Sequence, residues 1–190
     1  MNNWLCLRGS IKNIVKYDNT KSIFLLAIKR LSGTLDILPV KIDSNKLKDI
    51  EPGDFVIIFG KINSQNITIN GKQRVSVFCY AEKIVCLEIK SYFNKFISNG
   101  TLCKIKPLYH AGHNRILTEC ILSIQRKDNK YDYVPLVFWE KDAITVSELP
   151  IGTNVQISGR FQSRKYKTKD GSAEIVCEVS VNNLEIKKEI

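Results

Sequence analysis

Apolar and polar residues alternate with a period of two along most of the chain, a pattern that is typical of half-buried β-strands. In the C-terminal half this alternation predicts five strands, near 101–109, 116–126, 131–139, 153–166 and 173–186. Turn-forming residues separate the strands at Gly112-His113-Asn114, Asp128-Asn129 and Asp170-Gly171. A short helix is predicted near 140–149, between the third and fourth strands.

The N-terminal half repeats this order of signals. Its turns are predicted at Asp18-Asn19, Ser32-Gly33 and Asn70-Gly71, and the segment 43–51 takes the place of the helix. Five strands in about 90 residues, with a short helix after the third, form the pattern of an OB-fold, a small barrel that binds oligonucleotides and oligosaccharides. We therefore predict an all-β protein made of two tandem OB-fold five-stranded barrels, each with one short helix between strands 3 and 4.

Direct sequence matches indicate that the two halves arose by tandem duplication. The segments 51–62 and 150–161 share a Gly, a run of strand residues, a second Gly, a basic residue and a large apolar residue, at an offset of 99. Pro39 matches Pro135 at an offset of 96, and Leu5-Cys6 matches Leu102-Cys103 at an offset of 97. These matches predict one module over 1–90 and another over 101–190, joined by a linker over 91–100 with a short helical turn.

Outward positions of the second module combine aromatic rings with positive charge. Unpaired bases stack on such rings for ~1–3 kcal/mol each, while cations follow the phosphates. The alternative is that the rings pack against another subunit or the other module, and that the basic residues form a solvated edge that discourages aggregation. Tyr131 also fits a turn. The predicted nucleic-acid-binding residues are Tyr131, Tyr133, Trp139, Arg160, Arg164, Lys165, Tyr166 and Lys167, with Lys61 as the charged counterpart of Arg160 in the first module.

The first module lacks the aromatic set. At the positions of Tyr133, Trp139 and Tyr166 it has Ile37, Asp43 and Ile67. Its fourth strand instead has Phe55, Ile57 and Phe59 at outward positions, so that strand is apolar on both faces, which favours cover on both. We predict that these three residues form an interface, either with the second module or between the subunits of a dimer.

The charge balance favours a polyanionic partner. The 190 residues include 29 Lys and Arg against 19 Asp and Glu, a formal net charge of +10, and 44% are hydrophobic, as in a globular protein. Basic surfaces attract nucleic acids because each neutralised phosphate releases counterions. The longest apolar runs are far shorter than the ~20 residues of a membrane helix, and the first eight residues lack the features of a secretory signal. We predict a cytoplasmic protein without membrane association.

The chain lacks the residue patterns of common catalytic and cofactor sites. It has no Gly-rich phosphate loop, no Ser-His-Asp set and no compact carboxylate cluster for two metals. Its six cysteines form no Cys-x-x-Cys pair, and His110-x-x-His113 with Cys103 provides three ligands at most, fewer than a structural zinc site uses. We therefore expect reduced, mostly buried thiols, and a protein that is not an enzyme and uses no metal or other cofactor.

Three stretches of the second module resemble the DNA-binding domain of bacterial single-stranded DNA-binding proteins. They are 131–141, 152–166 and 178–181. In that family one aromatic residue enters the third strand, another ends it, and a third follows an Arg-Lys pair on the fourth; Tyr133, Trp139 and Tyr166 fill those places here. The resemblance implies that these rings stack on bases and that the protein binds single-stranded DNA of any sequence, without catalysis, in DNA replication and repair.

Two features depart from the usual member of that family. The chain ends at Ile190, directly after the last predicted strand, without the acidic, Phe-terminated tip that recruits partners. Two modules in one chain replace the usual tetramer of single modules, so a homodimer would supply four barrels. The compact size, the degenerate first module and the missing tail suggest a plasmid, phage or mobile-element relative. Two alternatives stay open: an OB-fold interaction module of a replication, primosome or conjugation complex, and RNA as the ligand, because stacking does not distinguish the sugars.

Overall fold

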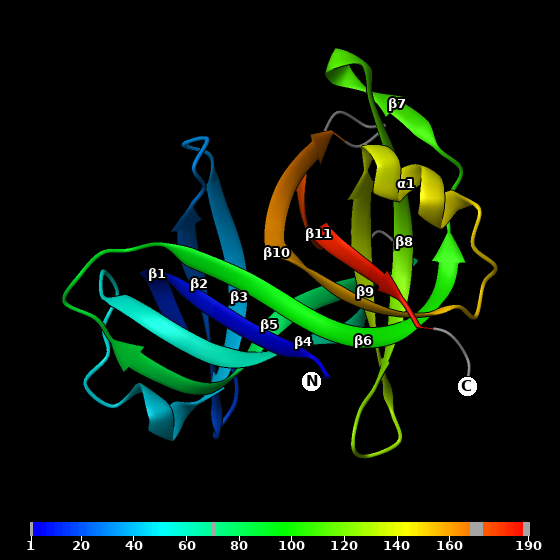
Figure 1. Cartoon of the computed structure of the whole chain (residues 1–190). Helices are drawn as coiled ribbons and strands as arrows, with labels where there is room; N and C mark the ends of the chain where they lie inside the picture. Colours follow the sequence, from blue (N-terminus) through cyan, green and yellow to red (C-terminus); the bar gives the residue numbers. More distant parts are fainter. Residues whose placement is uncertain (1, 70, 168–172, 188–190) are drawn as a thin grey trace.

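Strands form most of the protein in the computed structural model, which describes residues 2–69, 71–167 and 173–187 (Figure 1). The first half contains β1 (Trp4–Lys16), β2 (Lys21–Lys29), β3 (Leu35–Asp43), β4 (Phe55–Ile69) and β5 (Lys72–Cys86). The second half contains β6 (Phe93–Ile105), β7 (Tyr109–Ala111), β8 (Arg115–Gln125), β9 (Tyr131–Trp139), β10 (Asn154–Lys167) and β11 (Ala173–Ile186). The prediction of an all-β protein is confirmed.

In each half the strand pairings close into a ring of five strands. In the first half β1 pairs with β2 and β4, β3 pairs with β2 and β5, and β4 pairs with β5. In the second half β6 pairs with β8 and β10, β9 pairs with β8 and β11, and β10 pairs with β11. Alternate strand residues therefore face inward, and Leu38 in the first half and Leu136 in the second are fully buried.

A glycine in the fourth strand of each half permits a close approach of two backbones. A β-bulge interrupts the β4–β5 pairing directly before Gly60, and another interrupts the β10–β11 pairing directly before Gly159. A Cβ atom at Gly60 would collide with the carbonyl oxygen of Tyr80, and a Cβ atom at Gly159 would collide with that of Ser180. The second glycine of the sequence repeat is therefore required by packing at the bulge.

The helices are short. The second half has an α-helix, α1 (Glu140–Ser147), between β9 and β10, and a 3₁₀ helix, η2 (Gly112–Asn114), between β7 and β8. Ala143 and Val146 of α1 are fully buried. The first half has a 3₁₀ helix, η1 (Ser44–Leu47), between β3 and β4. Within the described residues no helix is long and apolar enough to cross a bilayer.

Strand β6 joins the two halves into one continuous sheet (Figure 1). Its residues 93–97 pair with residues 4–8 of β1 on one side, and β6 pairs with β10 on the other. The helical turn that we expected within 91–100 is wrong from residue 93 onward, where the chain is strand β6. Phe96 and Ser98 are fully buried while their neighbours are not, because successive side chains of a strand point to opposite faces of the sheet.

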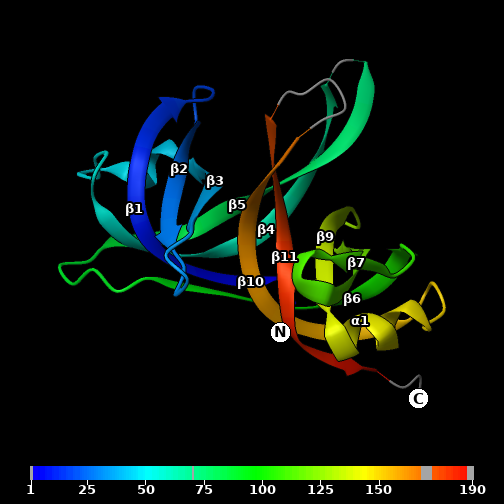
Figure 2. The same ribbon diagram turned by 90° about the horizontal axis from the view of Figure 1, so that it is seen from above.

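Two long arms, formed by β4 with β5 and by β10 with β11, extend on the same side of the molecule (Figure 2). Arg74 on β5 and Glu174 on β11 form an ion pair between the arms. The halves therefore meet both through the continuous sheet and through the arms.

Candidate nucleic-acid interface

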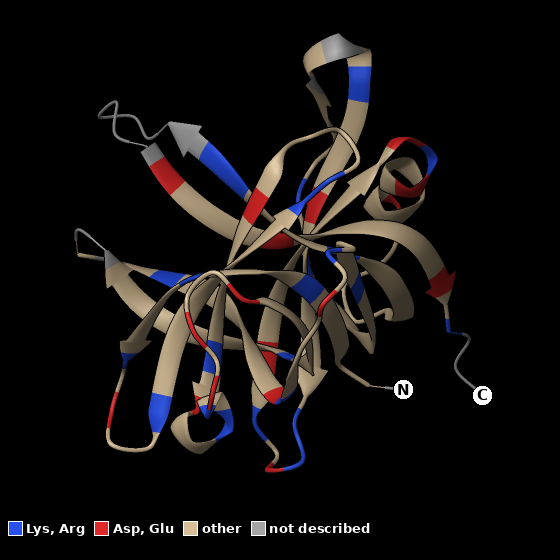
Figure 3. Cartoon of the chain, turned by 90° about the vertical axis from the view of Figure 1, so that its left-hand side faces the viewer, with Lys and Arg blue, Asp and Glu red and all other residues tan. Residues whose placement is uncertain are grey.

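A groove of about 900 Å³ lies between the two halves, and both of them line it. We call it the inter-half groove. Although Lys and Arg residues are spread over both halves (Figure 3), the groove itself has more basic than acidic side chains. The charged residues that line it are Arg30, Arg115, Arg160, Arg164 and Lys165, opposed by Glu119 and Glu178. Its walls therefore attract anions.

Trp139 ends β9 and lines this groove. Its indole Nε1 donates a hydrogen bond to Oγ of Ser180 on β11 at 3.2 Å. The guanidinium carbon of Arg115, on β8, lies 4.4 Å from the centre of the indole ring. The hydrogen bond and the cation–π contact together fix the orientation of the ring. The sequence analysis did not identify Arg115. This residue lies on β8, two positions before the residue that pairs with Trp139 across the two strands.

Tyr131 and Tyr133 lie on the same strand as Trp139 but do not line the inter-half groove. Their relative exposures are 48% and 42%. Tyr133 and Trp139 are six positions apart along the strand, a distance of about 20 Å. The backbone N–H of Tyr133 donates a hydrogen bond to Oγ of Ser64 in the first half at 2.8 Å. The structure thus places the two tyrosines at the opposite end of β9 from Trp139.

Arg164 lines the groove, but two carboxylates already compensate its charge. Its Nε donates to both carboxylate oxygens of Glu178, at 3.1 and 3.2 Å, and its Nη2 donates to Glu119 at 2.9 Å. Burial tends to raise the pKa of Glu119, but hydrogen bonding to Lys106 and the charges of Lys106 and Arg164 outweigh it and lower the pKa. A phosphate at Arg164 would compete with both carboxylates.

The other predicted basic residues differ in their surroundings. Lys165 is exposed at the groove. Lys61 forms an ion pair with Glu82. The side chains of Tyr166 and Lys167 lie outside the described residues, although their backbone belongs to β10. Among the predicted lysines whose side chains are described, Lys165 is therefore the one that lines the groove.

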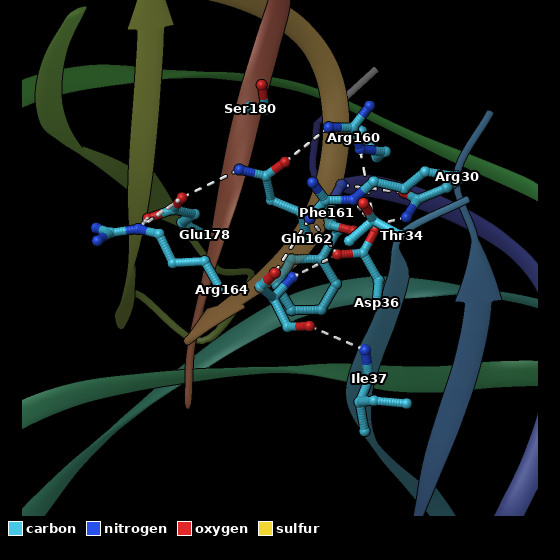
Figure 4. A network of polar contacts seen from close by, with 12 residues as sticks. Arg30, Thr34, Asp36, Ile37, Arg160, Phe161, Gln162, Arg164, Glu178 and Ser180 are labelled. Carbon is cyan, nitrogen blue, oxygen red and sulfur yellow. Dashed lines mark hydrogen bonds and ion pairs between the residues drawn. The ribbon is translucent and has the colours of Figure 1, made fainter. Parts of the chain in front are cut away.

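Asp36, which is fully buried, links the two halves beside the groove (Figure 4). Arg30 Nε donates to its Oδ2 at 2.8 Å, and the backbone N–H of Ser163 donates to its Oδ1 at 2.8 Å. Arg30 Nη2 also donates to the carbonyl oxygen of Ser163 at 3.1 Å. We call Arg30, Asp36 and Ser163 the first clamp.

The second clamp, formed by Arg126, Asp132 and Ser64, repeats this arrangement with the roles of the halves exchanged. Arg126 Nε donates to Asp132 Oδ2 at 2.7 Å, the N–H of Ser64 donates to Asp132 Oδ1 at 2.5 Å, and Arg126 Nη2 donates to the Ser64 carbonyl at 3.2 Å. Matching residues of the two clamps are 96 or 99 apart, which are offsets of the internal repeat. Aligning the two modules for shared Arg and Asp residues would have revealed both clamps.

The predicted interface residues lie on the face of the sheet that runs from β4 through β1 into β6. Phe55 is buried, while Ile57 and Phe59 are half-buried. Arg8 on β1 lies opposite both Ile57 and Phe93, so these residues share one face. Phe93 is 41% exposed. Apolar side chains from both halves therefore lie on the same face of the sheet.

The described residues contain no group of three or more His, Cys, Asp or Glu side chains that could hold a metal ion. Burial raises the pKa of the Cys120 and Cys177 thiols to about 12. Both thiols stay protonated at neutral pH and are therefore poor nucleophiles.

Comparison with known proteins relates the second half to one family. Residues 93–187 match the model of the "Single-strand binding protein family". A single-stranded DNA-binding protein of Clostridium tetani is 33% identical over 93 residues, which cover 45% of this chain and 64% of that protein. Single-stranded DNA-binding protein 1 of Clostridium acetobutylicum is 32% identical over 109 residues, covering 50% of this chain and 97% of that protein.

One similar structure extends over both halves. The crystal structure of the wild-type single-stranded DNA binding protein from Thermus aquaticus superposes with a TM-score of 0.77, covering 98% of this chain and 93% of that chain at 18% sequence identity. At this identity the likeness establishes a shared fold. It includes the first half, which the family model does not reach.

Proposed function

Because residues 93–187, half of its length, match the family model, this chain belongs to the single-strand binding protein family, and we propose that it binds single-stranded DNA in the inter-half groove. The observation that carries the proposal is Trp139, oriented by Ser180 and Arg115 in a groove of net positive charge. Every base has a face that can stack on an aromatic ring, and cations contact every phosphate. The combination supports affinity for unpaired strands of any sequence, with no chemical step.

The roles of the residues follow from their positions. Trp139 stacks on a base, and Arg115 and Lys165 contact the neighbouring phosphates. Tyr131 and Tyr133 offer a second stacking surface at the other end of β9, for a strand that continues along the protein. Arg164, held by two carboxylates, shapes the groove wall. The remaining expected contacts are Arg160, Tyr166, Lys167 and Lys61.

We propose that each five-stranded ring is an OB-fold and that the chain is a tandem pair of them. Three features recur in both halves at similar offsets: the order of strand pairings, the glycine at the bulge of the fourth strand, and the clamp. A duplicated module accounts for all three. In this arrangement α1 and η1 are the two versions of the connection between the third and fourth strands.

We propose further that the apolar face around Ile57, Phe59 and Phe93 forms a homodimer interface. Half-buried and exposed apolar side chains on one continuous sheet favour cover by another surface. A dimer would bring four barrels together and provide a longer path for the strand. Such a protein would act in the cytoplasm, where transient single strands form during DNA replication and repair.

The test is the affinity for a fluorescently labelled dT oligomer, measured by anisotropy at low salt. We expect Trp139→Ala to weaken binding by ~1–3 kcal/mol, which is about five- to 150-fold. Trp4→Phe is the matched control, because Trp4 lies on β1 away from the groove. If the wild-type protein binds no oligomer, the interaction-module alternative replaces the proposal, and if it prefers an rU oligomer, RNA is the ligand.

A further inference from the structure

A basic residue follows the bulge glycine in the fourth strand of each half, and the two basic residues differ in their charged partners. Arg160 of β10 and Lys61 of β4 occupy matching positions of the internal repeat, directly after the bulge glycine. Lys61 forms an ion pair with Glu82, the extra residue of the β5 bulge. The corresponding bulge residue of β11 is Asn182, which carries no charge. The repeat therefore supplies a carboxylate to Lys61 but none at the equivalent position to Arg160.

Arg160 shares a single carboxylate with Arg30. Its Nε lies 4.0 Å from Oδ2 of Asp36, which is beyond hydrogen-bonding distance, while Arg30 donates to both oxygens of that carboxylate (Figure 4). The other described contact of the Arg160 guanidinium is the neutral side chain of Gln162, at 2.7 Å. Among the described ion pairs the two guanidinium groups share one carboxylate, so this group of three carries one more positive than negative charge.

One donor of the Arg160 guanidinium also has no hydrogen-bond acceptor among the described residues. Its Nε is buried and has no hydrogen-bond partner within the part of the chain that the structure describes. Burial, together with the charge of Arg30, lowers the pKa of Arg160. A buried donor without an acceptor is unfavourable, and an anion with several oxygen atoms would satisfy both guanidinium groups at once.

The position of this pair connects it to Trp139. Arg160 lies directly opposite Ser180 in the β10–β11 pairing, and Ser180 accepts the hydrogen bond from the indole of Trp139. Arg30 and Arg160 are 20% and 34% exposed and both line the inter-half groove. An anion at the pair would therefore lie in the same groove as a base on Trp139.

We propose that Arg30 of the first half and Arg160 of the second form a phosphate-binding site for the nucleic-acid backbone at the junction of the halves. The first half, which lacks the aromatic set, then contributes to binding through charge. This inference rests on the proposed function, since the phosphate belongs to the strand that stacks on Trp139. Its occupant is a backbone phosphate of that strand.

The experiment gives Arg160 the carboxylate that Lys61 has. Asn182→Glu changes an exposed residue and leaves the first clamp intact, and Asn183→Glu adds the same charge one residue further on as the matched control. Affinity for a dT oligomer is measured from 50 mM to 1 M salt. One lost phosphate contact reduces the salt slope by about 0.7, which corresponds to about eightfold weaker binding at 50 mM salt relative to 1 M. Asn183→Glu should keep the wild-type slope.

A double-mutant cycle ties the effect to Arg160. In an Arg160→Gln background, Asn182→Glu should weaken binding no further, because the phosphate contact is already lost. Equal slopes for wild type, Asn182→Glu and Asn183→Glu would overturn the inference while leaving single-stranded DNA binding intact. Failure of the wild type to bind any oligomer would instead overturn the proposed function. Binding of inorganic phosphate to the wild type but not to Asn182→Glu, with no displacement of the oligomer at constant ionic strength, would assign the site to free phosphate and overturn the backbone assignment.

Discussion

Replacing Asp36 by Asn tests whether the first clamp stabilises the contact between the halves. Asp36 is fully buried and accepts hydrogen bonds from Arg30 and from the backbone of Ser163. Asn keeps one oxygen for the N–H of Ser163 but turns an amide NH₂ group toward Arg30. The substitution therefore removes a charge-assisted contact and leaves Arg30 and Arg160 without a carboxylate between them.

The expected loss of stability follows from these contacts. Hydrogen bonds to charged groups contribute about 1.5–3 kcal/mol each, and removal of one partner from a buried ion pair costs about 3–5 kcal/mol. The side chain of Arg30 is 20% exposed, so water can replace part of the lost interaction. We therefore expect the lower end of that range, about 3 kcal/mol of unfolding free energy.

Urea denaturation followed by circular dichroism measures this loss. With an m-value of about 2–3 kcal/mol/M, the midpoint should fall by about 1 M, and the melting temperature should fall by about 6–12 °C. Asp128→Asn is the control, because Asp128 and Lys130 are 54% and 73% exposed and solvent screens such surface pairs, so the substitution should leave stability nearly unchanged. If Asp36→Asn and Asp128→Asn shift the midpoint equally, the clamp does not hold the halves together.

Three further predictions concern the groove wall, the bulge and the thiols. Arg164→Gln should leave the salt slope of dT binding unchanged, because its charge is already compensated, whereas Arg115→Gln should reduce the slope by about 0.7; equal slopes in the two variants would contradict this. Gly159→Ala should destabilise the fold by about 1–3 kcal/mol in urea denaturation, since its Cβ atom meets a backbone oxygen, while Gly112→Ala, where no atom lies within 4 Å, should not. A thiol reagent at pH 8 should modify the two exposed cysteines of the native protein and all six after unfolding; rapid modification of a third native thiol would count against the buried, protonated state of the others.

The strands were largely predictable because local alternation defined them. The predicted bounds 131–139 and 173–186 agree with β9 and β11. The segment 91–100 was not predictable in the same way, because its strand conformation depends on pairing with β1 on one side and β10 on the other. The aromatic spacing in that segment also fits a helix, and only tertiary contacts decide between the two.

The site was predictable in part. Trp139 is at the end of the third strand of the second module, where alternation and family resemblance both placed it. The compensation of Arg164 was not predictable, because Glu119 and Glu178 come from other strands that fold around it. The contribution of Arg30 depends on how the halves meet, which no local pattern describes.

The most direct test of the central claim is the fluorescence of Trp139 during a titration with oligo-dT. In a Trp4→Phe variant, Trp139 is the sole tryptophan and reports on the groove alone. If a base stacks on its ring, the emission should fall in a saturable manner, and the binding constant should weaken with added salt. Unchanged emission under conditions where the oligomer is bound would show that the strand lies elsewhere on the protein, and would contradict the account.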